Sequence, residues 1–251
     1  MADSAWAAGR ASAFPADSEA PRHALFVRAT HWIAALCFLA LLLTGFEIVV
    51  SHPRFYWGET GNVLTPPLFK IPIASSRATV PTGYGYVLPD QNGWSRALHF
   101  QSAWILVLAG LVYLVFGSAG HFRKNLLPGK ADASLRALGT IIGNHLRFRR
   151  LDEEQASSYN ALQKLTYLSV IFFLTPLVIW TGLAMSPGFV AAVPATVRLL
   201  GGQQSARTIH FFVSLALLLF LVVHVVMVWR AGFTKRMRAM ITGSAAHREA
   251  R

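Results

Sequence analysis

Histidines recur at regular positions in the apolar parts of this chain. Three of them follow an arginine by three residues, and a fourth, His224, lies fourteen residues beyond the last of these. The three units are Arg28-Ala29-Thr30-His31, Arg96-Ala97-Leu98-His99 and Arg207-Thr208-Ile209-His210. An ionisable ring inside a membrane is costly, so an intramembrane histidine is by default a candidate functional residue. Imidazole nitrogens also serve as axial ligands of haem iron. Four such rings indicate two haems with two histidine ligands each.

The composition of the chain is that of a membrane protein. Its 251 residues are 54% hydrophobic and only 14% charged, with a mean hydropathy of +0.44. Crossing a bilayer core takes about 20 apolar residues. Four segments meet this length, at 27–49, 97–117, 163–186 and 208–230. Because lipid offers the backbone no hydrogen-bond partners, these segments must be helices. We therefore expect an all-α membrane protein, a four-transmembrane-helix bundle in which Pro176 kinks the third helix without breaking it.

The distribution of lysine and arginine orients the bundle. With the N-terminus inside, the inner regions 1–28, 118–164 and 230–251 hold 17 of the 23 lysines and arginines. By the positive-inside rule, both termini are cytoplasmic. The formal net charge of +12 then reflects topology and attraction to anionic lipid. A nucleic-acid-binding role would need a basic soluble domain with a recognisable motif, and the sequence has none.

The remaining chain divides into tails and connections. The expected parts are a disordered cytoplasmic tail at 1–21, a haem-binding membrane domain at 22–232 with an outer loop at 50–95 and an inner connection at 118–160, and a basic cytoplasmic tail at 233–251. Within the inner connection, residues 134–146 have the pattern of an amphipathic helix lying on the membrane surface. The single cysteine, Cys37, excludes disulfides and covalent c-type haem attachment, so any haem must be held noncovalently.

Depth in the membrane predicts how the four histidines pair. Fourteen helical residues advance about 21 Å and end about 40° short of full turns, so His210 and His224 share one helix face near opposite membrane surfaces. His31 begins its segment at the inner surface and His99 begins its segment at the outer surface. The depth-matched pairs are therefore His31 with His224 for an inner haem and His99 with His210 for an outer haem. The third segment contains no histidine, which predicts a packing role for it.

Each arginine of the repeated unit precedes a candidate ligand by about one turn. A cation at a helix N-terminus opposes the helix dipole, so Arg28, Arg96 and Arg207 need a compensating partner. Haem propionates are carboxylates that arginine can bind through two hydrogen bonds. The alternative is that these side chains extend to lipid phosphates.

Other readings of the histidines stay open at the level of sequence. A membrane histidine can simply bond a carbonyl on a neighbouring helix. His121, at the inner end of the second segment, could replace His31 as a ligand or serve a quinone. Glu47 is the only acidic residue inside an apolar segment, and it could relay protons or face water at the interface.

On these residues the chain resembles the bacterial di-haem b-type cytochromes. This family includes cytochrome b561 and the cytochrome b subunits of nickel hydrogenases, formate dehydrogenases and thiosulfate reductases. Its pattern is one histidine at the start of helix one, one at the start of helix two, and two histidines fourteen apart in helix four. The residues that match are His31, His99, His210 and His224. The segments Tyr159–Tyr167, Gly182–Gly188 and Ser205–Phe211 are similar to a branch paired with a periplasmic molybdopterin oxidoreductase.

The resemblance implies a function in electron transport. The protein would be a multi-pass subunit in the bacterial cytoplasmic (inner) membrane, carrying electrons through two b-type haems between the quinone pool of a respiratory chain and a partner oxidoreductase that it anchors. It would not be an enzyme on its own. A quinone site is expected beside the inner haem, near His31, His224 and His121. Two alternatives remain: a stand-alone membrane haem reductase, which would reduce an acceptor without a partner, and a histidine-based transporter or proton channel, which would bind no haem.

Overall fold

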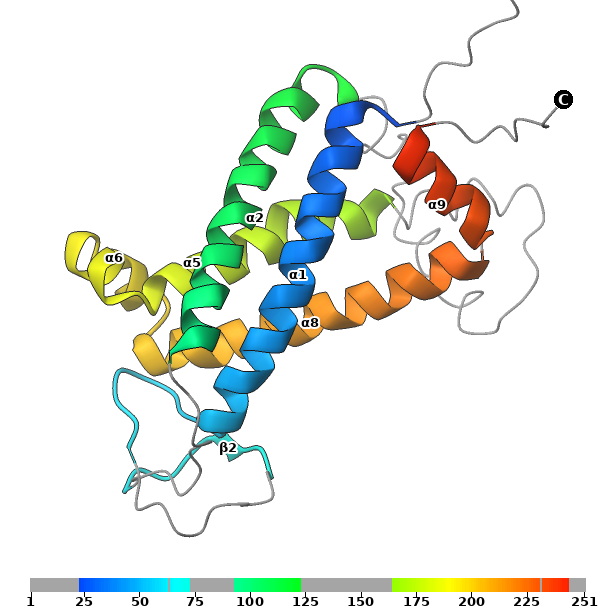
Figure 1. Ribbon diagram of the computed structural model, residues 1–251. Coiled ribbons are helices and arrows are strands. Elements are labelled where there is room, and N and C mark those ends of the chain that lie inside the picture. The colour runs from blue at the N-terminus through cyan, green and yellow to red at the C-terminus, as the bar shows by residue number, and fades with distance from the viewer. Residues whose placement is uncertain (1–22, 63, 73–92, 123–163, 231, 244–251) are drawn as a thin grey trace, which may run out of the picture.

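Four long apolar helices dominate the computed structural model, which describes residues 23–62, 64–72, 93–122, 164–230 and 232–243 (Figure 1). Each is long and apolar enough to cross a membrane: α1 (Leu25–Ser51), α2 (Trp94–Ser118), the third long helix (Lys164–Ala184) and α8 (Gln203–Arg230). The expected all-α membrane fold is confirmed, and the observed bounds lie within a few residues of those predicted. The tail at 1–21 and the amphipathic segment at 134–146 fall outside the described residues.

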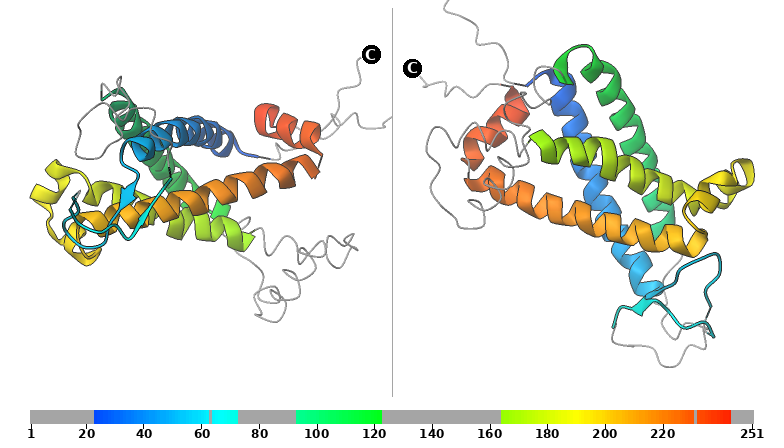
Figure 2. Two further views of the ribbon diagram at one scale, coloured as in Figure 1. Left: turned by 90° about the horizontal axis from the view of Figure 1, so that it is seen from below. Right: turned by 180° about the vertical axis from the view of Figure 1, so that it is seen from behind.

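The long helices form two hairpins. α1 packs along α2, and the third long helix packs along α8. Figures 1 and 2 show the two hairpins as two layers whose helix axes cross. Within the described residues, packing between helices is concentrated inside each hairpin and is sparse between the two. Side chains that meet across the layers are therefore the ones that connect the two halves of the bundle.

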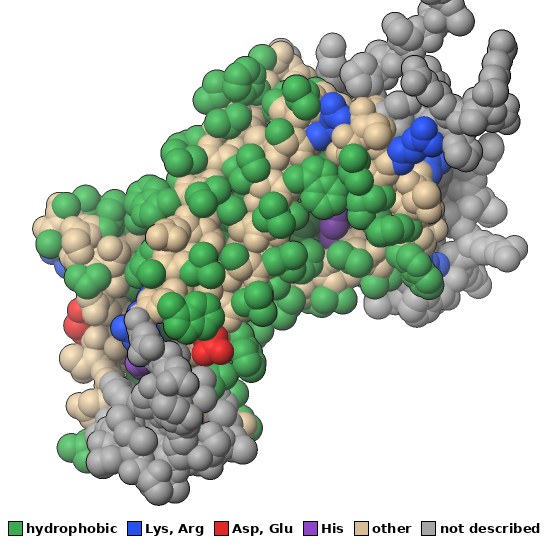
Figure 3. Space-filling model, viewed as in Figure 1, with side chains coloured by type: hydrophobic (Ala, Val, Ile, Leu, Met, Phe, Trp, Pro, Cys, Tyr) green, Lys and Arg blue, Asp and Glu red, His purple; other side chains and the backbone are tan. Residues whose placement is uncertain are grey.

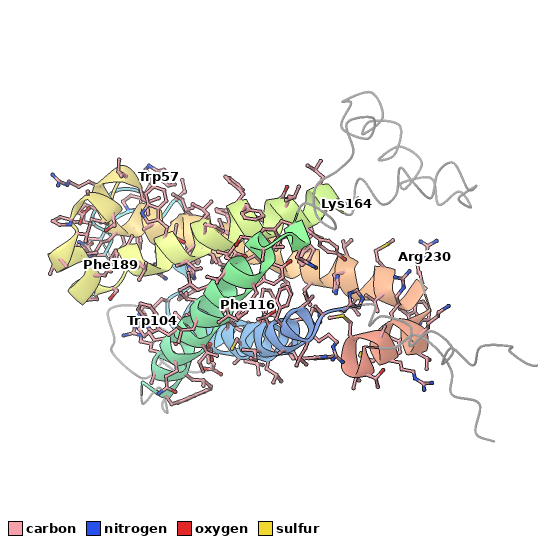
Figure 4. The ribbon with its side chains drawn as sticks, turned by 90° about the horizontal axis from the view of Figure 1, so that it is seen from above. Trp57, Trp104, Phe116, Lys164, Phe189 and Arg230 are labelled. Atoms are coloured by element: carbon pink, nitrogen blue, oxygen red, sulfur yellow. The ribbon has the colours of Figure 1, made fainter. Side chains whose placement is uncertain are left out.

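The outer surface of the bundle is suited to lipid. Leu36 and Leu43 of α1 are 68% and 71% exposed, and many other large apolar side chains of the long helices are exposed as well. Figure 3 shows hydrophobic side chains spread over this face, with lysine and arginine toward its ends. Exposed apolar surface of this extent marks a membrane-facing protein. Figure 4 places Lys164 and Arg230 at one end of the molecule, called here the inner end, and Trp57 and Phe189 at the other, the outer end.

The third long helix passes through a proline without ending. It contains a π-helical turn, η2 (Val170–Leu174), followed by α5 (Thr175–Ala184) with Pro176 in its first turn. A proline inside a helix removes one backbone hydrogen bond and clashes with the preceding turn. The wider turn of η2 immediately before Pro176 accommodates this clash, since such turns are where helices absorb local irregularity. The span continues to Ala184, as the sequence predicted.

Two short helices at the outer end were not predicted from the sequence. α6 (Pro187–Ala192) and α7 (Ala195–Leu199) join the third long helix to α8. Val197 of α7 is buried in a small core with Ala184 and Ala206. Small side chains at Ala184 and Ala206 let the two helix ends approach closely, so this connection fixes the outer ends of α5 and α8 against each other.

The outer loop holds the start of α8. A two-residue antiparallel pair joins β1 (Arg54–Phe55) to β2 (Phe69–Lys70). The loop then folds onto α8: the Gly58 carbonyl accepts hydrogen bonds from the backbone N–H groups of Gln204 and Ser205, at 3.0 and 3.2 Å. The first N–H groups of a helix have no partner within the helix, so Gly58 acts as their cap. In return, the Gly58 N–H donates to Ser205 Oγ at 2.7 Å.

Part of the expected basic tail is a helix. α9 (Phe233–Thr242) lies against the start of α1 at the inner end. Arg28 donates to the Ile241 carbonyl at 2.8 Å, and Trp32 Nε1 donates to the Met240 carbonyl at 3.1 Å. The last carbonyls of a helix lack partners within the helix and attract positive charge, which explains why an arginine binds there.

The loop cap gives a first prediction. Gly202 has φ of +114°, and a Cβ at this position would collide with the Gly58 backbone. We expect Gly202→Ala to destabilise the protein by about 1–2 kcal/mol from its backbone conformation alone, and to detach the loop from α8. Thermal unfolding of the detergent-purified protein measures this. Gly188→Ala is the matched control, since a Cβ there meets no atom within 4 Å. Equal melting temperatures for the two variants would contradict the assigned role of Gly58.

Candidate cofactor site

A first histidine pair lies toward the inner end and joins the two hairpins. His31 of α1 faces His224 of α8 with their ring centroids 6.3 Å apart. The surroundings are aromatic: Trp32 packs edge-on against His31 at 5.3 Å, while Phe220 stacks on His224 at 5.6 Å. Tyr167, from the third long helix, packs edge-on against His224 at 6.2 Å. These contacts keep both rings in an apolar setting.

A second histidine pair lies toward the outer end. His99 of α2 faces His210 of α8, again with ring centroids 6.3 Å apart. Each pair takes one ring from each hairpin, and α8 supplies one ring to both. The structure thus brings together the same two pairs that the depth argument predicts. Their role as ligands stays a prediction.

Both pairs have the spacing that one metal ion between two imidazoles requires. A metal–imidazole bond is about 2.0–2.1 Å long, which puts the ring centroids of two opposed ligands roughly 6 Å apart. In the part of the chain that the structure describes, no cluster of three or more His, Cys, Asp or Glu side chains could hold a metal ion. Each pair offers two imidazole rings, the number of histidine ligands that axial ligation of a haem iron by the protein can take.

Two threonine–glycine pairs surround the outer histidines, and sequence reasoning missed both. Thr44 Oγ1 lies 2.9 Å from His99 Nδ1, and Thr181 Oγ1 lies 3.0 Å from the Nδ1 of His210. A glycine follows each threonine, where a Cβ would sit 3.7 Å from His99 Cε1 or 3.5 Å from His210 Cε1. The recurrence of Thr-Gly inside two apolar segments was the signal available in the sequence. The third long helix, predicted to have only a packing role, therefore contacts the site through Thr181.

The arginines before the outer histidines gather around His52, at the C-terminal end of α1. Arg96 approaches His52 Nε2 with one guanidinium nitrogen at 3.4 Å. Arg207 donates to the His52 carbonyl, and its guanidinium lies 5.1 Å from the ring centroid of Phe55. At the inner end, Arg28 binds α9 as described above. Each arginine thus contacts another part of the protein. The sequence had suggested only haem propionates or lipid phosphates as partners.

His52 lies within the segment 50–95 that was expected to form the outer loop, and the structure places it half-buried between two cations. Burial lowers its pKa below the usual 6.5, and the guanidinium groups of Arg207 and Arg96 lower the pKa further. A backbone hydrogen bond with Ile48 opposes this in part. The folded protein therefore favours the neutral ring, whose Nε2 can accept a hydrogen bond from Arg96.

Comparison with known proteins assigns the family. The family model for prokaryotic cytochrome b561 matches residues 22–243. The chain belongs to the prokaryotic cytochrome b561 family. A relative from Azospira oryzae, named "Putative protein-methionine-sulfoxide reductase subunit YedZ1", is 30% identical over 227 residues, which cover 88% of this chain and 96% of that protein. No solved structure matches the chain.

Membership in the cytochrome b561 family confirms the resemblance seen in the sequence. It makes this chain a multi-pass membrane protein that binds b-type haem. The histidine pairs fit that cofactor in ligand type, spacing and apolar surroundings. His121 fits less well, because it packs against Phe26, Tyr113 and Phe122, whereas His31 is the ring opposite His224.

The buried position of His52 gives a prediction for this b561-family protein. Because its pKa is lowered on folding, the unfolded chain binds the proton more readily than the folded chain. Stability should therefore fall as the pH drops below about 6.5, toward the folded pKa. We expect His52→Gln, which cannot titrate but can still accept from Arg96, to lose less melting temperature between pH 7 and pH 5 than the wild type. An identical loss in both proteins would exclude His52 as a source of the acid sensitivity.

Proposed function

We propose that this protein is a di-haem b-type cytochrome subunit that moves electrons across the membrane, between the quinone pool and a partner oxidoreductase. The observation that carries the proposal is the presence of two histidine pairs with equal 6.3 Å ring spacing, one toward each end of the bundle. In this proposal His31 and His224 hold the inner haem. His99 and His210 hold the outer haem.

The shared helix α8 sets the path between the two haems. His210 and His224 are about 21 Å apart along the axis of α8. When bound, each haem iron takes up and releases one electron, and its conjugated ring extends the redox centre beyond the iron. The role of the chain would be to hold the two haems at a separation fixed by α8.

The surrounding residues exclude water and supply charge. Trp32, Tyr167 and Phe220 surround the inner pair with aromatic side chains. Apolar surroundings of this kind would disfavour the more highly charged ferric state of a bound haem. At the outer end, Arg96 and Arg207 lie close to the ends of the helices that carry His99 and His210. Their guanidinium groups are suited to the carboxylates of the outer haem, in addition to the contacts they make with His52.

The partner would dock at the outer end. The relative from Azospira oryzae is named as a subunit of a reductase, which supports a partnership of the same kind here. We propose a periplasmic, molybdopterin-type oxidoreductase that this subunit anchors to the bacterial inner membrane. The ordered loop over the start of α8, with α6 and α7, supplies a protein surface beside the outer pair. A quinone would exchange electrons at the inner end, near His31 and His224.

Haem counting tests the ligand scheme. A pyridine haemochrome assay on the purified protein should give about two b-type haems per chain. His99→Ala and His31→Ala should each lower the count to about one, because each removes one ligand of one haem. His121→Ala is the control and should keep both. A count of about one haem in His121→Ala, with two haems retained in His31→Ala, would reassign the inner ligand to His121.

The site of quinol oxidation is tested by following the reduction of the haems in proteoliposomes. A quinol added to the wild-type protein should reduce both haems, as followed by their visible absorbance. In His31→Ala, which lacks the inner haem, quinol should no longer reduce the remaining outer haem at the wild-type rate. Unchanged reduction of the outer haem would place quinol oxidation at the outer end instead.

A further inference from the structure

Two buried threonines occupy equivalent places in the two hairpins. Thr44 lies on the first helix of one hairpin and contacts His99 on the second, while Thr181 lies on the first helix of the other and contacts His210 on the second. Both side chains are fully buried, with 0% of their surface exposed. In each hairpin, therefore, a threonine followed by a glycine places its hydroxyl beside the Nδ1 atom of a histidine.

The direction of these hydrogen bonds follows from the other contact of each hydroxyl. Thr44 Oγ1 lies 2.7 Å from the Ala40 carbonyl, and Thr181 Oγ1 lies 2.8 Å from the Leu177 carbonyl. A carbonyl only accepts, so it receives the single hydroxyl hydrogen. The lone pair of each threonine oxygen is then left to accept from the ring N–H at Nδ1.

This assignment fixes the tautomer of both outer histidines. A neutral imidazole carries one hydrogen, so a hydrogen at Nδ1 leaves Nε2 as a bare lone pair. A histidine that binds a metal usually donates its other ring N–H to an acceptor, which orients the ring and makes the ligand more basic. The threonines supply this acceptor for His99 and His210. The adjacent glycines lie beside the same rings, where a Cβ would make van der Waals contact with His99 Cε1 at 3.7 Å or with His210 Cε1 at 3.5 Å.

The inner pair is built differently. His31 Nδ1 is buried and makes no hydrogen bond within the part of the chain that the structure describes. Aromatic side chains pack against the inner rings: Trp32 against His31, and Phe220 and Tyr167 against His224. Among the described residues, His31 therefore lacks the threonine contact that both outer histidines make, although the ring spacing of the two pairs is the same.

We propose that Thr44 and Thr181 are positioning residues of the outer haem site. They hold His99 and His210 as Nδ1–H tautomers with Nε2 directed at the iron, and they lower the reduction potential of the outer haem by strengthening both ligands. This inference rests on the proposed di-haem function and adds a source of asymmetry between its two centres.

Valine replaces threonine with nearly the same shape and no hydroxyl. We expect Thr44→Val and Thr181→Val to weaken haem binding at the outer site by about 10–100-fold, the usual effect of losing such a partner. In the haem that remains bound, the midpoint potential of the outer centre should rise and its low-spin ferric EPR signal should shift. The inner haem should keep its potential. Haem titration, redox titration and EPR of the purified protein measure these three effects.

The chain offers a matched control and a rescue. Thr30 on α1 is also buried and also donates to the carbonyl four residues earlier, the oxygen of Phe26 at 2.7 Å. Thr30→Val should leave the outer haem unchanged. Thr44→Ser and Thr181→Ser keep the hydroxyl and should restore the outer potential and the EPR signal.

The outcomes separate this inference from the proposed function. A wild-type protein that binds no haem contradicts the proposed function. A wild-type protein with two haems, whose Thr44→Val and Thr181→Val variants match Thr30→Val, contradicts only the role of the threonines. Serine variants that behave like the valine variants also overturn it, because a retained hydroxyl would then fail to preserve the outer site.

Discussion

A histidine ring in the interior of a membrane bundle needs a partner for each of its two nitrogens. Water is absent, and an unpaired polar atom there costs free energy. In the outer pair, the threonine hydroxyls engage Nδ1 of both rings, and the two ring centroids lie 6.3 Å apart across the hairpins. In the proposed function, a haem iron between the two rings would engage the remaining nitrogens. The need for a partner at Nδ1 explains why a threonine interrupts each of two otherwise apolar helices, at Thr44 and Thr181.

The rest of the fold keeps the two hairpins in register around these rings. α8 carries one histidine of each pair, so any shift of α8 along its axis moves both sites together. The outer loop caps the first turn of α8 through Gly58, and Arg207 binds the end of α1 at His52. At the inner end, α9 turns back from α8 and holds the start of α1 through Arg28 and Trp32. Contacts at the two ends thus join the hairpins where packing between the helices themselves is sparse.

Sequence reasoning predicted the parts that depend on hydropathy and helical spacing. The four spans, the passage through Pro176 and the meeting of His210 with His99 follow from long apolar runs and a fourteen-residue interval. It missed the parts that depend on side chains from different helices. Thr44 and Thr181 are ordinary residues of apolar segments until the neighbouring helix is placed beside them. The position of His52 between two cations could not be predicted, because Arg96 and Arg207 are distant from it in the sequence. The helix α9 is short, and its docking depends on two hydrogen bonds to α1.

We expect each of the two sites to hold one haem between two imidazoles. Near-infrared magnetic circular dichroism of the purified ferric protein, combined with haem quantification, is the decisive experiment, because the charge-transfer band reports the axial ligands of low-spin haem. We expect about two haems per chain, both with the band of bis-imidazole ligation. A band from histidine–methionine ligation, a high-spin spectrum, or a single haem in the intact wild-type protein would contradict this expectation.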